Sequence, residues 1–330
     1  MANSTMSDVA KEAGVALTTV GRVINGGYVS DEKRERVLAA IQKLGYVPNK
    51  MARSLKGGES KLIGVFMRFN TNQVFVSIAN GISKAVEAAG YNTFVVTSYR
   101  RDVSQDIDEF ISRKVDALMI ISIWDIDVAL IEKVQNAGIP VVMIERCLEI
   151  PKVDGVYIND RDGAKTAVKG MIRKGAVKPA FVGLPISALP HTYVERERYE
   201  GYLAALDEMN IEVNESRICF TDGYGLEDGR MAAEKLISGG VDFDSVFCTS
   251  DILAAGLMQY LYEKNIRVPD DVMIAGYDDT IARMLSPQIS SVTLDTDRIG
   301  VEAVSMALSR IKAPELPRRE VRVDTVYVDR

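Results

Sequence analysis

The sequence predicts a small all-α head followed by an α/β body of two doubly wound parallel-sheet lobes. Residues 1–60 contain three short helical patterns, with a glycine between the first two. From about residue 61, short β-branched runs alternate with longer amphipathic ones, which is typical of parallel sheets covered by helices. The chain has 330 residues, which is too long for one ordinary core, so two or more domains are expected.

The head opens with SDVAKEAGVALTTVGRVIN at residues 7–25. Thr5 and Asp8 have the spacing of a capping box before a first helix. Gly14 provides a turn that a side chain would obstruct, and a second helix is expected from about residue 17. This pattern indicates a helix-turn-helix, whose second helix enters the major groove of DNA. The alternative is an ordinary three-helix domain.

A third helix is expected from Ser30, which is followed by two acidic residues that suit a first helical turn. The segment YVPNKMARSLKGG, residues 46–58, then contains a short helical pattern with basic residues around Leu55. A nine-residue helix is too short to be stable alone. An exposed Leu flanked by basic residues suits a wedge in the minor groove, so this segment is expected to order on DNA.

Charge and cysteine content limit the class of protein. Residues 1–60 hold nine Lys and Arg against six Asp and Glu, whereas the remainder holds 31 against 40, which suggests a polyanionic partner for the head. The three cysteines are far apart and fit neither a disulfide framework nor a zinc site, as expected in a reducing cytoplasm. No apolar run suits a membrane span, and the N-terminus is too polar for a signal peptide.

The body pattern predicts nine or more strands, more than one doubly wound sheet usually holds. The apolar runs include LIGVFM, NTFVVT, DALMIIS, IPVVMI, KPAFVG, DSVFCTS and DVMIAGYDD, with helix-like segments between them. Two lobes are therefore favoured over one sheet. Ligands of such folds bind beyond the carboxyl ends of the strands.

In this order, the segments resemble the lactose/galactose repressor family of bacterial transcription factors. The resemblance covers the whole chain and rests on MSDVAKEAGVALTTVGRVIN, VSDEKRERVLAAIQKLGYVPN, MARSLKGG, LIGVF, RYEGY, FCTSDILAAGLM and VPDDVMIAGYDDT. It implies a head at residues 1–48, a hinge helix and linker at 49–60, and an effector-binding and dimerisation body at 61–330. The body would be of the periplasmic-binding-protein type, with lobes of about 61–160 plus 291–320 and 161–290 plus 321–330.

The resemblance also implies which residues contact DNA. Leu17, Thr18 and Arg22 are expected to face base edges, where Arg can read guanine and Leu offers only apolar contact. The other expected DNA-binding residues are Thr5, Thr19, Asn25, Tyr28, Asn49, Ala52, Arg53 and Leu55. Ala16 and Gly21 stand where the family commonly has hydroxyl residues, so one helix cap and one phosphate contact are expected to be missing.

For the effector, the resemblance implies a cleft between the lobes. The expected effector-binding residues are Gln73, Phe75, Ser122, Trp124, Glu145, Arg146, Arg198, Ser250, Asp251 and Asp278. Carboxylates, amides and Arg recognise sugar hydroxyls, and an aromatic face suits a sugar ring. Structural alternatives remain open, because Trp124 can pack in a core and Asp278 can cap a helix. His191 is expected to be an ordinary loop residue.

Four arginines could give the cleft a preference for anions. Arg68, Arg146, Arg196 and Arg198 would together favour a carboxylate or phosphate on the ligand. Taken singly, Arg68 and Arg196 are also typical of a solvated surface. The effector is therefore expected to be a sugar, a sugar acid or a sugar phosphate.

These features predict a cytoplasmic transcriptional regulator that acts as a repressor, rather than an enzyme. One histidine leaves little material for a His-based triad, GYGLEDG at 223–229 lacks the spacing of a dinucleotide loop, and no cofactor or metal is expected. A homodimer is expected because two half-sites require two-fold symmetry. The alternatives are a cytoplasmic sugar-binding protein and a DNA-binding protein whose body senses nothing.

Overall fold

The chain forms two compact units in a computed structural model, Met1–Ser60 and Lys61–Arg330. The structure describes residues 4–24, 26–46, 59–68, 72–100, 102–122, 126–145, 150–186 and 193–330. The expected hinge helix, with Asn49, Ala52, Arg53 and Leu55, lies outside these residues.

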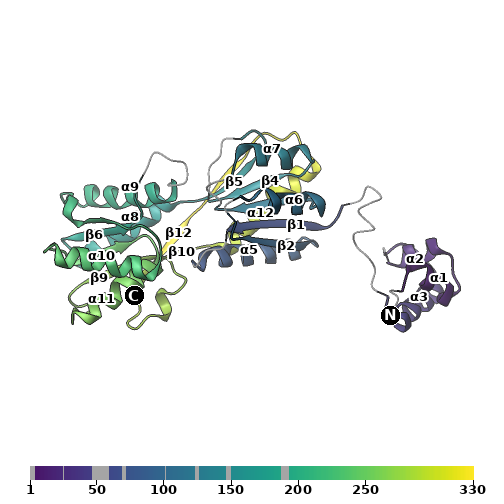
Figure 1. Cartoon of the computed structure of the whole chain (residues 1–330), viewed down its shortest axis with the longest axis horizontal. Coiled ribbons are helices and arrows are strands. Elements are labelled where there is room, and N and C mark those ends of the chain that lie inside the picture. The colour runs from purple at the N-terminus through teal and green to yellow at the C-terminus, as the bar shows by residue number, and fades with distance from the viewer. Residues whose placement is uncertain are drawn as a thin grey trace. The chain divides into compact units, whose positions relative to one another are not determined.

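The first unit contains three helices around a small apolar core (Figure 1). They are α1 (Met6–Ala13), α2 (Leu17–Ile24) and α3 (Asp31–Leu44), and each contacts the other two. The buried residues of this core are Val9, Ala10, Ala13, Val20, Val23, Val37 and Ala40. The predicted all-α head is confirmed.

The turn between α1 and α2 follows from local sequence. The Asp8 N–H donates to Thr5 Oγ1 over 3.3 Å, and the Asp8 carboxylate accepts from the Thr5 N–H at 2.9 Å, which completes the predicted capping box. Gly14 ends α1 with φ at +61°, a conformation that favours glycine. The carbonyl of Ala16 accepts the first hydrogen bonds of α2, but its methyl side chain has no oxygen with which to cap the helix.

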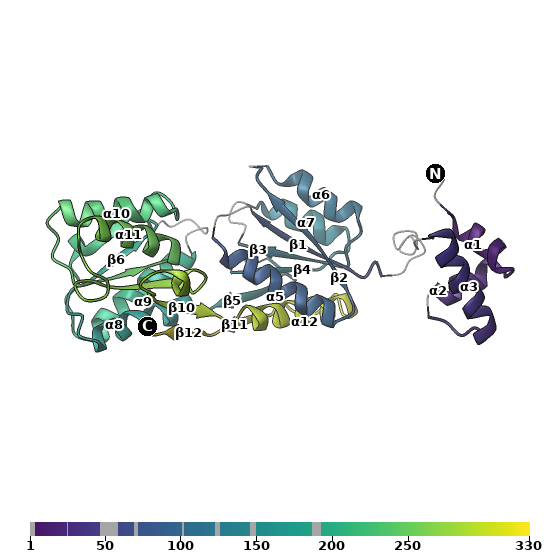
Figure 2. The same cartoon turned by 90° about the horizontal axis from the view of Figure 1, so that it is seen from below.

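The second unit has two lobes, each built on one six-stranded sheet in the described residues (Figures 1 and 2). The first lobe contains β1 (Leu62–Arg68), α5 (Val74–Ala88), β2 (Asn92–Ser98), α6 (Ser104–Ser112), β3 (Ala117–Ile121), α7 (Val128–Asn136), β4 (Val141–Ile144), β5 (Asp154–Ile158), α12 (Thr296–Lys312) and β11 (Glu320–Val323). Its strand order is β11-β5-β4-β3-β1-β2, and all neighbouring strands are parallel.

The second lobe repeats this architecture with one antiparallel edge. It contains α8 (Asp160–Arg173), β6 (Pro179–Gly183), α9 (Tyr193–Glu208), a 3-10 turn (Glu215–Arg217), β7 (Ile218–Phe220), α10 (Leu226–Ser238), β8 (Ser245–Cys248), α11 (Asp251–Glu263), β9 (Met273–Asp278), a second 3-10 turn (Ala282–Met284), β10 (Ser290–Leu294) and β12 (Thr325–Val328). The strand order is β12-β10-β9-β8-β6-β7. β12 runs antiparallel to β10, whereas the other neighbours are parallel.

Helices cover both faces of each sheet, as the alternating pattern predicts. Along β1, Ile63 and Val65 belong to the apolar cluster that includes α5 and α12, whereas Phe66 belongs to the cluster with α6 and α7. In the second lobe, α8 and α9 contribute to the cluster that spans both lobes, and α10 and α11 build a separate one. The carboxyl ends of the strands stay uncovered and can carry polar side chains.

The chain crosses between the lobes after β5, after β10 and after β11 in the described residues. The lobe boundaries expected at 291 and 321 therefore need correction, because both fall inside strands. β10 pairs with β9 as far as Thr293, and β11 pairs with β5 as far as Val323. Two crossings are tied together, since the Asn159 N–H donates to the Val323 carbonyl over 3.0 Å and the Asn159 amide donates to the Asp324 carboxylate.

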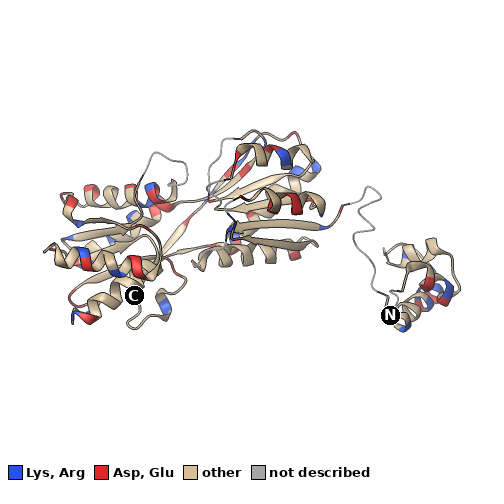
Figure 3. Ribbon diagram, in the orientation of Figure 1, with Lys and Arg blue, Asp and Glu red and all other residues tan. Residues whose placement is uncertain are grey.

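In the body, charged residues lie mainly on the helices that cover the sheets (Figure 3). Cys219 and Cys248 are free and buried. None of the helices in the described ranges is both long and apolar enough to cross a bilayer. Within the same ranges, no group of His, Cys, Asp or Glu side chains is arranged to hold a metal ion.

Candidate functional site

α2 presents a free face on the head. Val20 and Val23 are buried in the core of the head, whereas Thr18 and Arg22 are exposed and Leu17 is 51% exposed. The spacing i, i+1, i+5 places these three exposed residues on one side of the helix. The structure thus brings together the residues expected to face base edges.

Arg22 differs from two other arginines of the head. Its side chain forms no hydrogen bond or ion pair with any residue that the structure describes. Arg34 Nη2 donates to the Gly27 carbonyl over 3.1 Å, and Arg36 Nη2 donates to the Ala13 carbonyl over 2.6 Å. Arg34 and Arg36 therefore hold the head together, and the guanidinium of Arg22 is left for a partner.

The other expected DNA-binding residues have mixed positions. Thr5 is exposed but its hydroxyl takes part in the capping box, and Thr19 is half-buried. Tyr28 is 93% exposed. Asn25 lies outside the described residues, as do the expected contacts of the hinge.

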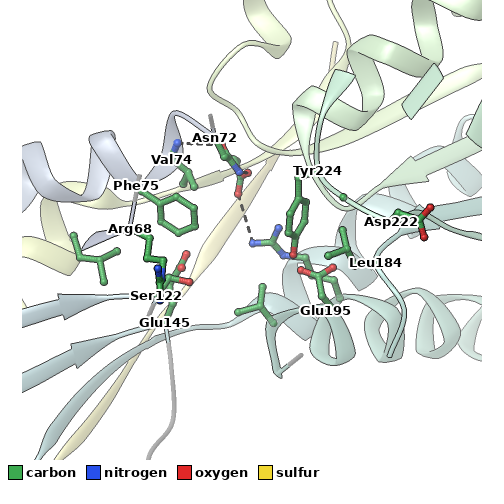
Figure 4. A pocket seen from close by; sticks show the side chains of 15 residues that line it. Arg68, Asn72, Val74, Phe75, Ser122, Glu145, Leu184, Glu195, Asp222 and Tyr224 are labelled. Atoms are coloured by element: carbon green, nitrogen blue, oxygen red, sulfur yellow. Dashed lines mark hydrogen bonds and ion pairs between the residues drawn. The ribbon is translucent and has the colours of Figure 1, made fainter. Parts of the chain in front are cut away.

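The body contains a cavity of about 230 Å³, lined by residues of both lobes (Figure 4). It lies where β1, β3, β4, β6 and β9 reach their carboxyl ends, as the fold predicts. The volume is below the ~300–1,000 Å³ typical of pockets for drug-sized ligands. A small ligand therefore suits this cavity.

Five of the expected effector-binding residues line the cavity: Phe75, Ser122, Glu145, Arg198 and Asp278. Trp124 and Arg146 lie outside the described residues, as does His191. The cavity also has lining residues that sequence reasoning missed, namely Asn72, Val74, Ile121, Leu184, Val194, Glu195, Asp222, Gly223 and Tyr224.

Gln73, Ser250 and Asp251 are not among the residues that line the cavity. Gln73 is exposed at the start of α5, and its neighbour Asn72 lines the cavity instead. Ser250 caps α11, since its hydroxyl accepts from the Leu253 N–H over 3.3 Å.

Asp251 has a structural role behind the cavity. Its carboxylate accepts from the Ser291 hydroxyl over 2.6 Å and from the backbone N–H groups of Ile281 and Ala282 over 3.2 Å. Burial raises the pKa of Asp251 to about 7, although the hydrogen bond from Ser291 opposes this effect. The side chain holds the turn after β9 to α11.

Arg198 is buried and fully engaged within the protein. Its Nε donates to Asp160 over 2.8 Å and its Nη1 donates to the Thr249 carbonyl over 2.6 Å. Its Nη2 lies 3.5 Å from the carboxylate of Asp278, and its guanidinium carbon lies 3.7 Å from the ring centroid of Tyr277. Burial acts to lower the pKa of Arg198, but the two aspartates outweigh it and raise that pKa.

Asp278 links the two lobes through Asn72. The Asn72 amide donates to the Asp278 carboxylate over 2.8 Å, and the Asn72 side-chain oxygen accepts from the Val74 N–H at 3.1 Å. Burial raises the pKa of Asp278, while Arg198 and Asn72 oppose that rise. This contact joins residues 206 positions apart, so no local sequence pattern could reveal it.

Two buried glutamates complete the cavity. Burial, with the nearby charge of Asp160, raises the pKa of Glu145 to about 8. Burial also raises the pKa of Glu195 to about 7, against the attraction of Arg198. The Leu184 N–H is close enough to lower the pKa of Glu195 in part, yet neither carboxylate oxygen of Glu195 has a hydrogen-bond partner among the described residues.

A sequence signal for Glu195 does exist. It lies three residues before Arg198 in VERERYEGY, and residues three apart share one face of a helix. This spacing places Glu195 on the same helix face as Arg198 and so predicts that it is an effector-binding residue too.

Backbone conformation marks the same strand ends. Ser122, Glu145 and Asp278 have φ values of +46°, +68° and +92°. Non-glycine residues rarely adopt this region, and such strain of about 1–3 kcal/mol per residue is concentrated at functional sites.

Of the four arginines expected at the cleft, Arg68 and Arg198 line the cavity, and Arg146 lies outside the described residues. Arg196 is absent from the cavity lining, and Arg198 is neutralised by two aspartates. Arg68 lines the cavity, and its guanidinium donates to the Arg100 carbonyl. The described residues therefore give little support to the expected preference for a carboxylate or phosphate.

Comparison with known proteins agrees with this architecture. Residues 5–49 match the family described as bacterial regulatory proteins, lacI family, and residues 168–330 match a periplasmic binding protein-like domain. The lac repressor dimer bound to operator and the anti-inducer ONPF has the same fold, with a TM-score of 0.84 and 23% identity over 100% of this chain and 98% of that one.

Two further proteins are more similar in sequence. The complex of the transcriptional regulator CelR with cellobiose superposes with a TM-score of 0.71 and 28% identity, covering 99% of this chain and 98% of that one. The ribose operon repressor of Haemophilus influenzae is 31% identical over 318 residues, which are 94% of this chain and 93% of that protein. With its helix-turn-helix head and its two-lobed body, the chain belongs to the lacI family of bacterial regulatory proteins.

Proposed function

We propose that this regulator is a repressor that reads operator DNA with the free face of α2 and responds to a small polar ligand held between the lobes of its body. The observation that carries the proposal is the presence, in one chain, of an unengaged Arg22 side chain beside exposed Leu17 and Thr18 and of a cavity between the lobes that contains buried carboxylates and strained backbone. The protein acts by binding rather than by catalysis, and it acts in the cytoplasm, where bacterial DNA lies.

DNA recognition would use different chemistry at each exposed position of α2. Arg22 can donate two hydrogen bonds to the O6 and N7 atoms of guanine, and Leu17 can contact a thymine methyl group. Thr18 can exchange hydrogen bonds with a base edge. Thr5, Thr19 and Asn25 are proposed to contact phosphates, which fix the position of the head without reading sequence.

Ligand recognition would use the five predicted residues that line the cavity together with Asn72 and Glu195. Phe75 and Tyr224 supply aromatic surfaces for a ring, and buried oxygens supply acceptors for hydroxyl groups. The solved complexes of CelR with cellobiose and of the lac repressor with an anti-inducer support a ligand in the body of this chain as well.

A homodimer would connect the two activities. The lac repressor in the operator complex is a dimer, and two heads on two half-sites require two-fold symmetry. Ligand-driven movement of the lobes would change the spacing of the two segments at 49–57 and so their order on DNA. Leu55 is the residue whose insertion between base steps would couple that order to a bend in the operator.

In vitro selection from random duplexes tests the DNA-reading role with the full chain. Selection is expected to enrich a two-fold symmetric site. Arg22→Ala should then reduce discrimination between the selected site and random DNA by about 1–3 kcal/mol. Arg267→Ala, an exposed ion-pair residue of the second lobe, is the control and should bind like the wild type. Failure to enrich any site, or equal losses of Arg22→Ala on selected and random DNA, would contradict base reading by α2.

A further inference from the structure

The cavity holds more buried acid than base, which bears on what its ligand is. Glu145, Glu195 and Asp278 line it and Asp160 lies behind it, whereas its described cations are the buried Arg198 and the half-buried Arg68. We propose that the effector presents a protonated amine to Glu195, with Glu145 adding attraction from the other lobe. This inference rests on the proposed function, because it names the chemical class of the ligand of the same cavity.

Arg198 cannot serve as the partner of Glu195. Its three nitrogens face Asp160, the Thr249 carbonyl and Asp278, and its flat face lies over the ring of Tyr277. Each of the three guanidinium nitrogens thus has a partner within the protein. Arg198 attracts both glutamates, but it forms its ion pairs with Asp160 and Asp278 and with neither glutamate.

Glu195 is the feature that requires a ligand. Its residue is 3% exposed, and both carboxylate oxygens are buried without a hydrogen-bond partner among the described residues. Figure 4 shows the carboxylate directed into the cavity from α9. A buried carboxylate without donors is costly, so such a group persists where a ligand supplies what the protein lacks.

Glu145 approaches from the opposite lobe. It follows β4 in the first lobe, whereas Glu195 belongs to α9 in the second, and both line the same cavity (Figure 4). The Ser122 hydroxyl hydrogen-bonds to Glu145. Glu145 has no ion pair with a cation among the described residues. A ligand cation between the lobes is attracted by both carboxylates and would favour a closed cleft.

An ammonium group fits this arrangement better than neutral or acidic groups. Hydroxyl groups can donate hydrogen bonds to Glu195 but do not compensate negative charge on the two glutamates in a site of low dielectric constant. A carboxylate or phosphate would add a like charge to them. A protonated amine donates hydrogen bonds and also neutralises charge, and hydrogen bonds between charged groups are about twice as strong as neutral ones.

The test compares matched ligands on the full chain. D-glucosamine, D-galactosamine and D-mannosamine are each measured against the parent sugar, with D-galacturonate and glucose 6-phosphate as anionic probes, by thermal shift and calorimetry at pH 7.5. At least one amine should bind more than tenfold more tightly than its parent, and the anions should be the weakest. Equal affinities within each pair, a preference for an anion, or no binding of any amine would overturn the proposal.

Two variants place the effect at Glu195. Glu195→Gln should reduce the amine preference to less than about threefold, whereas Glu197→Gln, on the same helix but outside the cavity lining, should retain it. Without ligand at pH 8, Glu195→Gln should raise the melting temperature by about 2–4 °C, because it removes an unpaired buried charge. A lower melting temperature would show that Glu195 stabilises the fold and would contradict the inference.

Operator binding separates this inference from the proposed function. If a neutral sugar alone releases the selected duplex, the sensing role stands and the amine inference fails. If no selected duplex is found at all, the proposed function fails, whatever the amine panel shows.

Discussion

Two buried charge clusters in the body differ in how completely their members are paired. Asp154, at the start of β5, accepts from Arg310 Nη2 and from Arg319 Nη2, both over 2.6 Å, and from the Arg319 N–H over 2.9 Å. Although burial acts to raise the pKa of Asp154, these hydrogen bonds lower it. In the cavity cluster, burial instead raises the pKa of Glu145 and Glu195.

The difference separates a structural role from a binding role. The Asp154 cluster ties α12 and the loop after it to the beginning of β5, and each charged group has a partner of opposite sign. The cavity cluster lies at the carboxyl ends of the strands, where a ligand can enter, and its glutamates lack an equivalent cation in the described part of the chain. Unpaired buried charge therefore marks the site better than burial or charge alone.

The largest expected loss of stability comes from removing the carboxylate at the centre of the Asp154 cluster. Asp154→Ala leaves the side chain of Arg310 buried without its carboxylate, and the free energy of unfolding should fall by about 3–5 kcal/mol. Denaturant unfolding of the full chain measures this loss. Asp271→Ala, which removes an exposed ion pair with Arg267, is the control and should cost less than about 1 kcal/mol. Similar losses for the two variants would mean that burial does not distinguish the pairs.

A smaller effect on the free energy of unfolding is expected from a change of pH, because the glutamates of the cavity cluster titrate. The pKa values of Glu145 and Glu195 are raised to about 8 and about 7 in the folded protein, so the folded state binds more protons than the unfolded state above pH ~4.5. The stability that these groups contribute is present below pH ~4.5 and is lost as pH rises through 7 and 8.

Unfolding measured from pH 5 to pH 9 checks this sign. Glu145→Gln should be less sensitive to pH than the wild type over that range, because its side chain does not titrate. Glu197→Gln provides the matched control on a half-buried glutamate outside the cavity lining. An identical pH profile for Glu145→Gln and the wild type would show that Glu145 is not the group responsible.

The sequence predicts the layers of the fold well, because alternating apolar runs are local patterns. Every run quoted for the body is a strand, from LIGVFM at β1 to DVMIAGYDD at β9. The quoted runs do not include β5, β7, β10, β11 or β12. The three-residue β7 is too short to show a periodicity. The positions at which the chain crosses between the lobes after β10 and after β11 depend on pairing between strands far apart in sequence.

The site was only partly predictable, for a different reason. Five cavity residues followed from family positions, but those positions say nothing about how each side chain is paired. Arg198 was expected to seek an anionic or hydroxyl partner in the ligand, and the fold supplies Asp160 and Asp278 instead. Pairing between distant segments decides which groups remain for a ligand, so it required the structure.

The smallest expected effect applies the same comparison to the head, where Arg36 is engaged and Arg22 is not. Arg36 donates to the carbonyls of Ala13 and Gly14 at the end of α1, so Arg36→Ala should lower the local stability of the head by about 1 kcal/mol. Arg22→Ala removes no hydrogen bond within the described residues and should leave that stability unchanged. Hydrogen exchange of the α1 amides in the full chain measures both effects. Arg36→Ala should speed exchange about fivefold, since 1.4 kcal/mol corresponds to a factor of ten. If Arg22→Ala sped it equally, Arg22 would be part of the structure of the head, and the free face of α2 would lose its strongest candidate for reading a base.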